Sequence, residues 1–334
     1  MLIRQVSLTN FRNHSLYHLD CRPDTTLIIG KNGCGKTSVL EAIYILMNGK
    51  SFRATDPEII KRGAAFYRIE LEYDNGETIV ATYNGTTKTF IVGDGKARRL
   101  PKKHRHPVIL FEPPDLNLVG GSPARHRDYF NRFFGQLSSD YASCVSRYDK
   151  ALRQRNQLLK SEHFDETALA SWDLLLARYG TKLRELRQSY TQIINHSINT
   201  VYHSIAENQD VVSLAYRSST GSVDESAYLQ TLNATHAKDR CLGHTYFGVH
   251  KDDFDFIFND KQADGSASRG ETRSIILALK FIEADTIYHI LHEKPIILLD
   301  DVFSELDDKR RRCLVSNFKN HQVIITSVES PKSY

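Results

Sequence analysis

The sequence predicts an α/β fold in which a P-loop unit is joined to an antiparallel β meander and carries an inserted, short helical arm. Three observations predict this class. The octapeptide GKNGCGKT at residues 30–37 stands between an apolar run and a helical pattern. Two Asn-Gly dipeptides, at residues 75–76 and 84–85, separate segments of alternating polarity. Between residues 169 and 193 the apolar side chains recur in alternating steps of three and four, which is heptad spacing.

The octapeptide matches the pattern G-x-x-x-x-G-K-[ST] in the setting that gives this pattern its physical meaning. Residues 25–29 predict a buried strand before it, and residues 38–47 predict a helix after it. The turn then exposes backbone N–H groups to phosphate oxygens at the helix N-terminus, so the chain is predicted to bind a nucleoside triphosphate. The candidate ATP-binding residues of the loop are Gly30, Lys31, Asn32, Gly33, Cys34, Gly35, Lys36, Thr37 and Ser38.

Further strands are expected on both sides of this unit. Before it, residues 2–11 and 17–21 alternate loosely between apolar and polar side chains. After it, three alternating segments are separated by the Asn-Gly dipeptides, which favour hairpin turns because both residues tolerate positive φ. The sequence therefore predicts an antiparallel meander formed by residues 67–73, 77–83 and 88–92.

The middle of the chain predicts helices. Residues 106–111 predict a buried strand, and Ser122-Pro123 then offers an N-cap and a first-turn proline for a helix. The heptad segment, with a weaker one at residues 141–159 that is interrupted by Arg155, predicts an antiparallel helical arm that turns near residues 161–165. About 23 residues at ~1.5 Å each make this arm only ~35 Å long. Two ordinary helices packed on a globular core remain the alternative, because short heptad matches arise by chance. The predicted seam consists of Leu169, Trp172, Leu176, Tyr179, Leu183, Leu186, Tyr190 and Ile193.

The C-terminal part follows a polar stretch at residues 213–227 and returns to regular structure. Strands are expected at residues 254–258, 295–299 and 322–325, and helices at residues 271–288 and 307–318. The sequence thus predicts three parts, which are the P-loop half of a nucleotide-binding head at residues 1–135, the inserted arm at residues 136–237, and the second half of the head at residues 238–334.

The apolar strand at residues 295–299 delivers two carboxylates, Asp300 and Asp301, to the predicted nucleotide site. A P-loop needs such a carboxylate for the Mg²⁺ that bridges the phosphates, together with the hydroxyl of Thr37. Alone, the pattern is typical of a strand that meets a polar turn, but coupled to a P-loop it is far more specific. We assign Asp300 to the metal and Asp301 to the attacking water, as its general base or as the group that positions it. Lys36 would neutralise the β- and γ-phosphates.

A second anion site is predicted where the segment ASRGETR, at residues 267–273, opens a helix. The hydroxyl of Ser268 and the N–H groups of the first helical turn are donors for an anion. The alternative is that Ser268 only caps the helix. Its place between the P-loop and Asp300 favours the anion site, because this arrangement resembles the signature loop of ABC-type ATPases.

Four segments, GKNGCGKT, ASRGETR, LLDDVFSELD and VIITS, occur in this order along the chain. Their order and type resemble the ABC-type ATPase head that SMC proteins and break-repair ATPases share. More narrowly, the chain resembles the RecF family of bacterial DNA replication and repair proteins over nearly its full length. The further blocks that carry this resemblance are LIRQVSLTNFRNH, KSFRATDPEIIKRG, FEPPDLNLVGGSPARHRDYFN and GVHKDDFDF.

The resemblance implies a dimer that binds DNA in an ATP-dependent way and acts at single- and double-stranded, gapped or stalled DNA during repair and the SOS response. It implies ATP and Mg²⁺ as cofactors, a weak DNA-stimulated ATPase activity, and help in loading RecA together with RecR and RecO. Two heads would enclose two ATP molecules, each between the P-loop of one subunit and the signature of the other. Ser268, Gly270 and Arg273 would then act across the dimer, and Arg12 matches an N-terminal segment near the nucleotide as a candidate phosphate contact.

Several residues depart from the pattern of transporter ATPases. Arg269 stands where transporters have glycine, Asp301 where they have glutamate, and Thr326-Ser327 where they have a histidine. These changes fit the RecF pattern and imply slow hydrolysis, because a shorter carboxylate reaches the water less well. The FEPPDL loop offers Glu112 in place of a glutamine, and Val249 replaces an expected proline. A nucleotide-binding subunit of a transporter is therefore disfavoured, whereas an ATP-gated DNA clamp without useful turnover stays open.

Charge and composition bound the possible partners. The formal net charge is only +4, so contact with nucleic acid has to come from local clusters of basic side chains. Residues 96–106 form such a cluster, from which Lys102, Lys103 and Arg105 are the candidate DNA contacts. The alternative is a solvated charged loop. The five cysteines lack metal-site spacing, and no apolar run approaches the ~18 residues of a membrane helix. A cytoplasmic protein without a membrane partner is expected.

Overall fold

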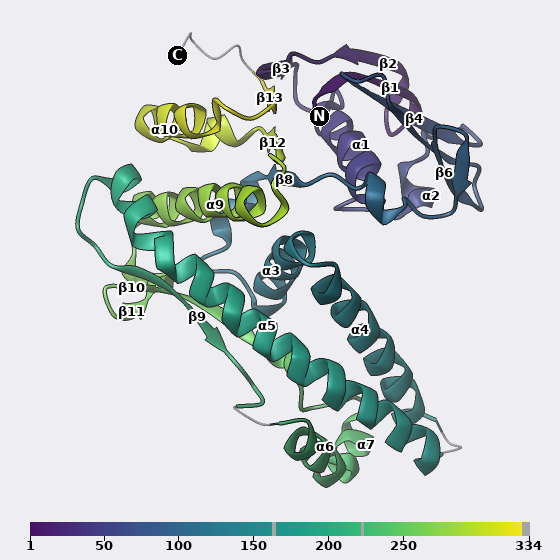
Figure 1. Cartoon of the computed structure of the whole chain (residues 1–334), viewed down its shortest axis with the longest axis vertical. Coiled ribbons are helices and arrows are strands. Elements are labelled where there is room, and N and C mark those ends of the chain that lie inside the picture. Colours follow the sequence, from purple (N-terminus) through teal and green to yellow (C-terminus); the bar gives the residue numbers. More distant parts are fainter. Residues whose placement is uncertain (162–164, 222–223, 329–334) are drawn as a thin grey trace. The chain divides into compact units, whose positions relative to one another are not determined.

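The computed structural model describes residues 1–161, 165–221 and 224–328 and contains two compact units (Figure 1). Unit 1 consists of Met1–Asp115 and Ile287–Tyr334, and unit 2 consists of Leu116–Thr286. The predicted division into head and arm at residues 135 and 237 uses other limits and stays a prediction. The predicted turn of the arm, near residues 161–165, lies mostly outside the described residues.

The first sheet of unit 1 is the predicted meander. Gly76 and Gly85 lie in two of its turns with φ of +82° and +89°, a conformation that glycine adopts without steric cost. The meander is confirmed. The predicted segments 67–73 and 88–92 match the limits of two strands, and the segment 77–83 begins one residue later than predicted. In spatial order the six antiparallel strands are β2 (His14–Asp20), β1 (Ile3–Phe11), β4 (Tyr67–Tyr73), β5 (Thr78–Tyr83), β6 (Lys88–Val92) and β7 (Gly95–Ala97).

The second sheet of unit 1 is parallel and positions the nucleotide motifs. Its four strands are β3 (Thr25–Ile29), β13 (Val323–Ser327), β12 (Ile296–Asp300) and β8 (Val108–Phe111), in this spatial order. Because parallel strands all end at one edge of a sheet, the P-loop after β3 and Asp301 after β12 come to the same edge.

A helix buried on all sides, α1 (Lys36–Asn48), packs against strands of both sheets of unit 1. Every residue from 38 to 47 is buried, which explains why this helix is apolar all round. Glu41 is the one carboxylate in this buried segment. The remaining elements of the unit are α2 (Asp56–Ile59), η1 (Lys102–His104), η4 (Val302–Glu305) and α10 (Asp308–Phe318).

Unit 2 combines a small antiparallel sheet with long helices. The sheet has the order β11 (Lys261–Gln262), β10 (Asp253–Phe258) and β9 (Val212–Arg217). Strand β9 overlaps the stretch at residues 213–227, which was expected to be merely polar. That expectation was wrong, because pairing with β10 stabilises a segment whose own alternation is weak. The helices are α3 (Pro123–Leu137), α4 (Ser139–Leu159), α5 (Glu166–Ala206), α6 (Glu225–Ala234), α7 (His236–Leu242), η3 (Val249–Lys251) and α8 (Ala263–Ser266). Two elements, η2 (Pro113–Asn117) and α9 (Arg269–Leu291), extend across the limits of the units.

Helices α4 and α5 form the predicted antiparallel pair. Three contacts fix their direction, since Tyr141 meets Arg187, Arg147 meets Tyr179, and Arg155 meets Asp173. The predicted length was wrong for α5, which has 41 residues and therefore spans about 60 Å. Beyond the predicted seam its apolar face continues through Ile194, Ile198, Tyr202 and Ile205, and this part packs on β9 rather than on α4. Because the packing partner of α5 changes from α4 to β9, α5 continues beyond the end of the heptad pattern.

The buried seam of the arm contains charged residues that the apolar pattern omits. Arg155, which interrupts the predicted spacing, is fully buried. Its guanidinium donates to Asp173 at 2.5 Å, to Asp239 at 2.7 Å and to the Thr245 hydroxyl at 2.9 Å. Among the predicted seam residues, Ile193 is 42% exposed. Arg155 therefore joins α4, α5 and α7 through ion pairs rather than through apolar packing.

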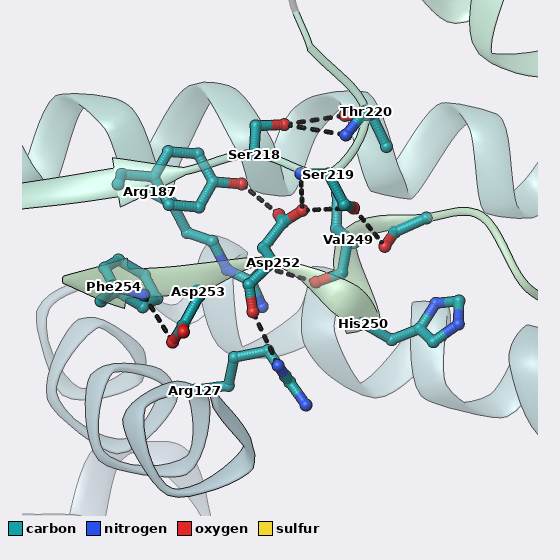
Figure 2. Close-up of polar contacts among 12 residues, drawn as sticks. Arg127, Arg187, Ser218, Ser219, Thr220, Val249, His250, Asp252, Asp253 and Phe254 are labelled. Atoms are coloured by element: carbon teal, nitrogen blue, oxygen red, sulfur yellow. Dashed lines mark hydrogen bonds and ion pairs between the residues drawn. The ribbon is translucent and has the colours of Figure 1, made fainter. Parts of the chain in front are cut away.

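A second buried polar cluster surrounds Asp252, in the GVHKDDFDF block (Figure 2). One carboxylate oxygen accepts hydrogen bonds from the backbone N–H and hydroxyl of Ser219, at 2.8 and 2.7 Å. The other accepts from Arg187 at 3.1 Å and from the Tyr216 hydroxyl. Its backbone carbonyl accepts from Arg127 at 2.6 Å. This aspartate thus links α3, α5 and β9 in the interior of unit 2.

Candidate nucleotide-binding site

A cleft of ≈ 720 Å³ opens at the edge of the parallel sheet where β3 and β12 end. This volume lies in the range of ligand pockets. Its walls carry five cationic side chains and three carboxylates, a balance that suits a polyanionic ligand. The lining residues are Arg12, Asn13, Asn32, Gly33, Gly35, Lys36, Thr37, Ser38, Arg53, Glu58, Ile60, Lys61, Arg62, Asp300 and Asp301.

Most of the predicted ATP-binding residues therefore meet in one cleft. Gly30, Lys31 and Cys34 belong to the same loop but are not among the described residues that line it. The cleft also contains side chains that the sequence analysis missed. They belong to Asn13 and to the segment 53–62, which follows α1 and includes α2. Arg53, Lys61 and Arg62 belong to the block KSFRATDPEIIKRG, which carried the family resemblance but to which no site role was assigned.

The P-loop is held by the turn between β1 and β2. Asn13 Nδ2 donates to the carbonyl of Gly33, and His14 Nε2 donates to the carbonyl of Gly35, each at 3.1 Å. Gly35 has φ +102°, and a Cβ at this position would lie 2.3 Å from the His14 ring. Only glycine fits there, for steric and conformational reasons together. The Lys36 ammonium is largely buried and donates to the carbonyl of Gly30 at 2.6 Å.

The carboxylates after β12 contact the P-loop helix directly. Asp300 Oδ1 accepts hydrogen bonds from the hydroxyls of Thr37 at 2.9 Å and Thr326 at 2.8 Å. Thr37 and Asp300 thus present a hydroxyl and a carboxylate oxygen side by side, although 263 positions separate them in the chain. Oxygen ligands of this kind are what Mg²⁺ prefers, so these residues fit the predicted metal.

Asp301 follows at the same edge in a left-handed conformation, with φ +52°. Its N–H donates to the Thr326 hydroxyl at 3.0 Å, which fixes the backbone. Burial raises the pKa of the Asp301 carboxyl, and the neighbouring charge of Asp300 adds to this rise, while Lys36 opposes it. The carboxyl therefore lines the cleft as a more basic group than an exposed aspartate.

A fully buried carboxylate, Glu41, lies behind the cleft wall and holds two arginines. Arg12 donates to it through Nε and Nη2, at 2.8 and 2.7 Å. Arg53 donates through Nε and Nη2, at 3.1 and 2.8 Å, and the Ser51 hydroxyl donates at 2.6 Å. Burial alone would raise the pKa of Glu41, but the hydrogen bonds from Arg12 and Arg53 outweigh it, so the pKa is lowered.

The predicted signature residues lie in unit 2, whereas all described cleft residues lie in unit 1. Ser268 is exposed and caps α9, since its hydroxyl accepts from the N–H of Glu271 at 3.3 Å. The Glu271 carboxylate in turn accepts from the N–H of Ser268 at 2.6 Å, which completes a capping box. Gly270 and Arg273 in the first turns of α9 are half-buried. Their predicted action on a nucleotide stays a prediction.

The predicted DNA contacts lie on and beside η1 and are not among the described residues that line the cleft. Lys102, Lys103 and Arg105 are exposed. Two histidines of the same cluster pair with acidic residues, His104 with Glu77 at 2.9 Å and His106 with Glu293 at 2.7 Å. Within the described part of the chain, no carboxylate forms an ion pair with Lys102, Lys103 or Arg105.

Comparison with known proteins decides the family. The model of an AAA ATPase domain matches residues 1–225. The DNA replication and repair protein RecF of Clostridioides difficile is 32% identical, over 98% of this chain and 92% of that protein. The chain belongs to the RecF family. RecF of Moorella thermoacetica is 33% identical over 98% of this chain and 90% of its own length.

The fold of this RecF-family chain is similar to that of solved structures. A structure of the recombination mediator protein RecF with ATP in the RecFOR pathway has a TM-score of 0.88 and 26% identity, and covers 100% of this chain and 93% of that chain. An SMC head bound to the C-winged helix domain of ScpA has a TM-score of 0.55 and 12% identity, over 99% of this chain and 90% of that chain, and shows the fold alone. The predicted fold class is confirmed. Across residues 1–161, 165–221 and 224–328, no helix combines the length and apolar character that a membrane crossing needs.

Proposed function

We propose that this RecF-family chain is an ATPase that closes as a dimer around two ATP molecules and thereby binds DNA during replication and repair. The observation that carries this proposal is the meeting of Lys36, Thr37, Asp300 and Asp301 in one basic cleft. The RecF family and its solved structure with ATP support the choice of nucleotide. Acting at gapped DNA, with RecR and RecO in loading RecA, is part of the proposal and follows from the family resemblance.

Each cleft residue has a chemical role in this proposal. The backbone N–H groups of residues 30–37 and the Lys36 ammonium bind the phosphates. Thr37 and Asp300 hold Mg²⁺, which neutralises phosphate charge when bound. The raised pKa of Asp301 suits a group that orients a water and accepts its proton. Arg12 adds a further cation to the lining of the cleft.

The shared site of the dimer rests on the N-terminus of α9. Its first turn presents N–H groups and the exposed Ser268 hydroxyl, and a helix of 23 residues has a full dipole at that end. Gly270 and Arg273 would complete an anion site for the nucleotide of the partner subunit. In the structure the Ser268 side chain caps its own helix, and we propose that it also contacts the partner's ATP.

The proposed function is tested by comparing ATP with ADP. ATP contributes interface free energy through the phosphate that ADP lacks, so the protein is expected to sediment as a dimer and to bind gapped DNA with ATP only. Equal dimerisation and DNA affinity in both nucleotides would contradict the proposal. Phosphate release measured in the same samples separates an ATPase from a DNA clamp without turnover, because only the ATPase releases phosphate faster when DNA is added.

Exchanging lysines in the η1 cluster tests the DNA surface. If Lys102 and Lys103 contact phosphates, replacing both with glutamine is expected to weaken binding to all duplex sequences alike. The slope of log affinity against log salt should fall by about 0.9 for each lost contact. Replacing the exposed Lys251 and Lys261 of unit 2 is the matched control. An unchanged slope in the Lys102/Lys103 variant would show that the cluster is only solvated.

A further inference from the structure

Glu41 carries a charged side chain in α1, a helix whose buried side chains are mostly apolar. Apolar packing does not explain a carboxylate at this position. Glu41 lies one turn after Thr37 on α1, with no exposed surface, among residues that are all buried. A buried charge of this kind is costly unless it is fully paired. Four N–H groups from Arg12 and Arg53 and the hydroxyl of Ser51 supply that pairing.

Both arginines face the cleft with part of their donors. Arg12 uses Nε and Nη2 for Glu41 and donates from Nη1 to the Glu58 carbonyl at 3.0 Å. Arg53 uses Nε and Nη2 for Glu41. In the hydrogen bonds described, Arg12 therefore uses three of its five N–H groups and Arg53 two. The side chains are 22% and 36% exposed, and both residues line the cleft.

The backbone around this trio is also fixed. Arg12 has φ +57°, and its N–H donates to the Ile59 carbonyl at 2.7 Å. Lys61 Nζ donates to the Asn13 carbonyl at 2.8 Å. The β1–β2 turn is thus joined to residues 51–61 by backbone contacts and to α1 by Glu41.

We propose that Glu41 is a positioning residue, which holds Arg12 and Arg53 together as a two-cation wall for the phosphates of the nucleotide. Two guanidinium groups at one wall repel each other, and the carboxylate between them offsets this repulsion while leaving one net positive charge. The two hydrogen bonds from each guanidinium group to Glu41 also fix the plane of that group, so less side-chain freedom is lost when phosphates bind. This inference rests on the proposed function, and it assigns to Arg53 and Glu41 a part in nucleotide binding.

The test is a double-mutant cycle on MgATP affinity, measured by equilibrium titration with a fluorescent ATP analogue. Glu41→Gln and Arg12→Ala are each expected to weaken binding by about tenfold, and the double variant by no more than about twofold beyond either. The cycle of Glu41→Gln with Arg53→Ala is expected to show the same losses of affinity. If Glu41 had only a structural role, Glu41→Gln would lower the thermal unfolding midpoint, and its effect on ATP affinity would not be coupled to the effects of the arginine variants. Affinity of Glu41→Gln within twofold of the parent, or losses that multiply in the double variants, would overturn the proposal.

Controls keep the result interpretable. Glu72→Gln removes a half-buried carboxylate that pairs with Arg4 at 2.9 Å in the same unit, and it is expected to leave affinity unchanged. If Glu41→Gln does not fold, Glu41→Asp replaces it, because aspartate keeps the charge on a side chain one methylene shorter. In the cycle of Glu41→Asp with Arg12→Ala, the losses of ATP affinity must again not multiply. Lys36→Ala in the same titration distinguishes the ATP site itself from the role of Glu41. Parent-like binding by Lys36→Ala would refute the proposed ATP site, whereas loss in Lys36→Ala with parent-like Glu41→Gln would refute only the role of Glu41.

Discussion

Replacing Lys36 with alanine is expected to abolish ATP turnover and the ATP-dependent binding of DNA. Lys36 is largely buried, and its ammonium donates to the carbonyls of Gly30 and Lys31 within the loop. Removing one preorganised electrostatic group from such a site typically costs about 10²–10³ in rate. Loss of nucleotide binding would also remove the free energy that drives dimer closure on DNA.

The measurement is phosphate release together with DNA binding in ATP, for Lys36→Ala and for a control. Lys50→Ala is a suitable control, because Lys50 is exposed just beyond the end of α1. The control is expected to match the parent in both assays. Equal DNA affinity for Lys36→Ala and the parent in ATP would show that DNA binding does not depend on this site.

The parts of the structure that follow from local chemistry could be predicted from the sequence. The Asn-Gly turns set the limits of β4 and β6, because positive φ is needed at residues 76 and 85. Asp300 could be placed because a continuous apolar strand ends at it and a P-loop requires a carboxylate. In these cases short segments with a known local chemistry carry the signal.

The parts that depend on contacts between distant segments could not be predicted. Arg155 looked like an interruption of a seam, but its partners Asp239 and Thr245 lie more than 80 positions away. Glu41 stands in an apolar stretch, and no periodic pattern indicates its pairing with Arg12 and Arg53. Strand β9 forms because β10 pairs with it, and α5 continues because the sheet replaces α4 as its partner.

The central claim is that one ATP site is shared between two subunits, and a mixture of two inactive variants tests it. Ser268→Arg has an intact P-loop and a broken signature, whereas Lys36→Ala has the reverse. Each homodimer would contain two defective sites and is expected to be inactive. A mixed dimer would combine the intact P-loop of the first chain with the intact signature of the second, and would therefore contain one complete site.

The most direct measurement is ATP hydrolysis in an equal mixture of Ser268→Arg and Lys36→Ala with DNA present. Random pairing makes about half of the dimers mixed, each with one of two sites complete, so about a quarter of the parent activity is expected. Ser266→Arg, which changes another exposed serine two positions earlier, is the matched control and is expected to be active alone. Recovery of this size would show that the signature of one chain completes the P-loop site of the other. Mixed dimers that form but show no recovery at any ratio would contradict the shared site and would leave Ser268 as the cap of its own helix.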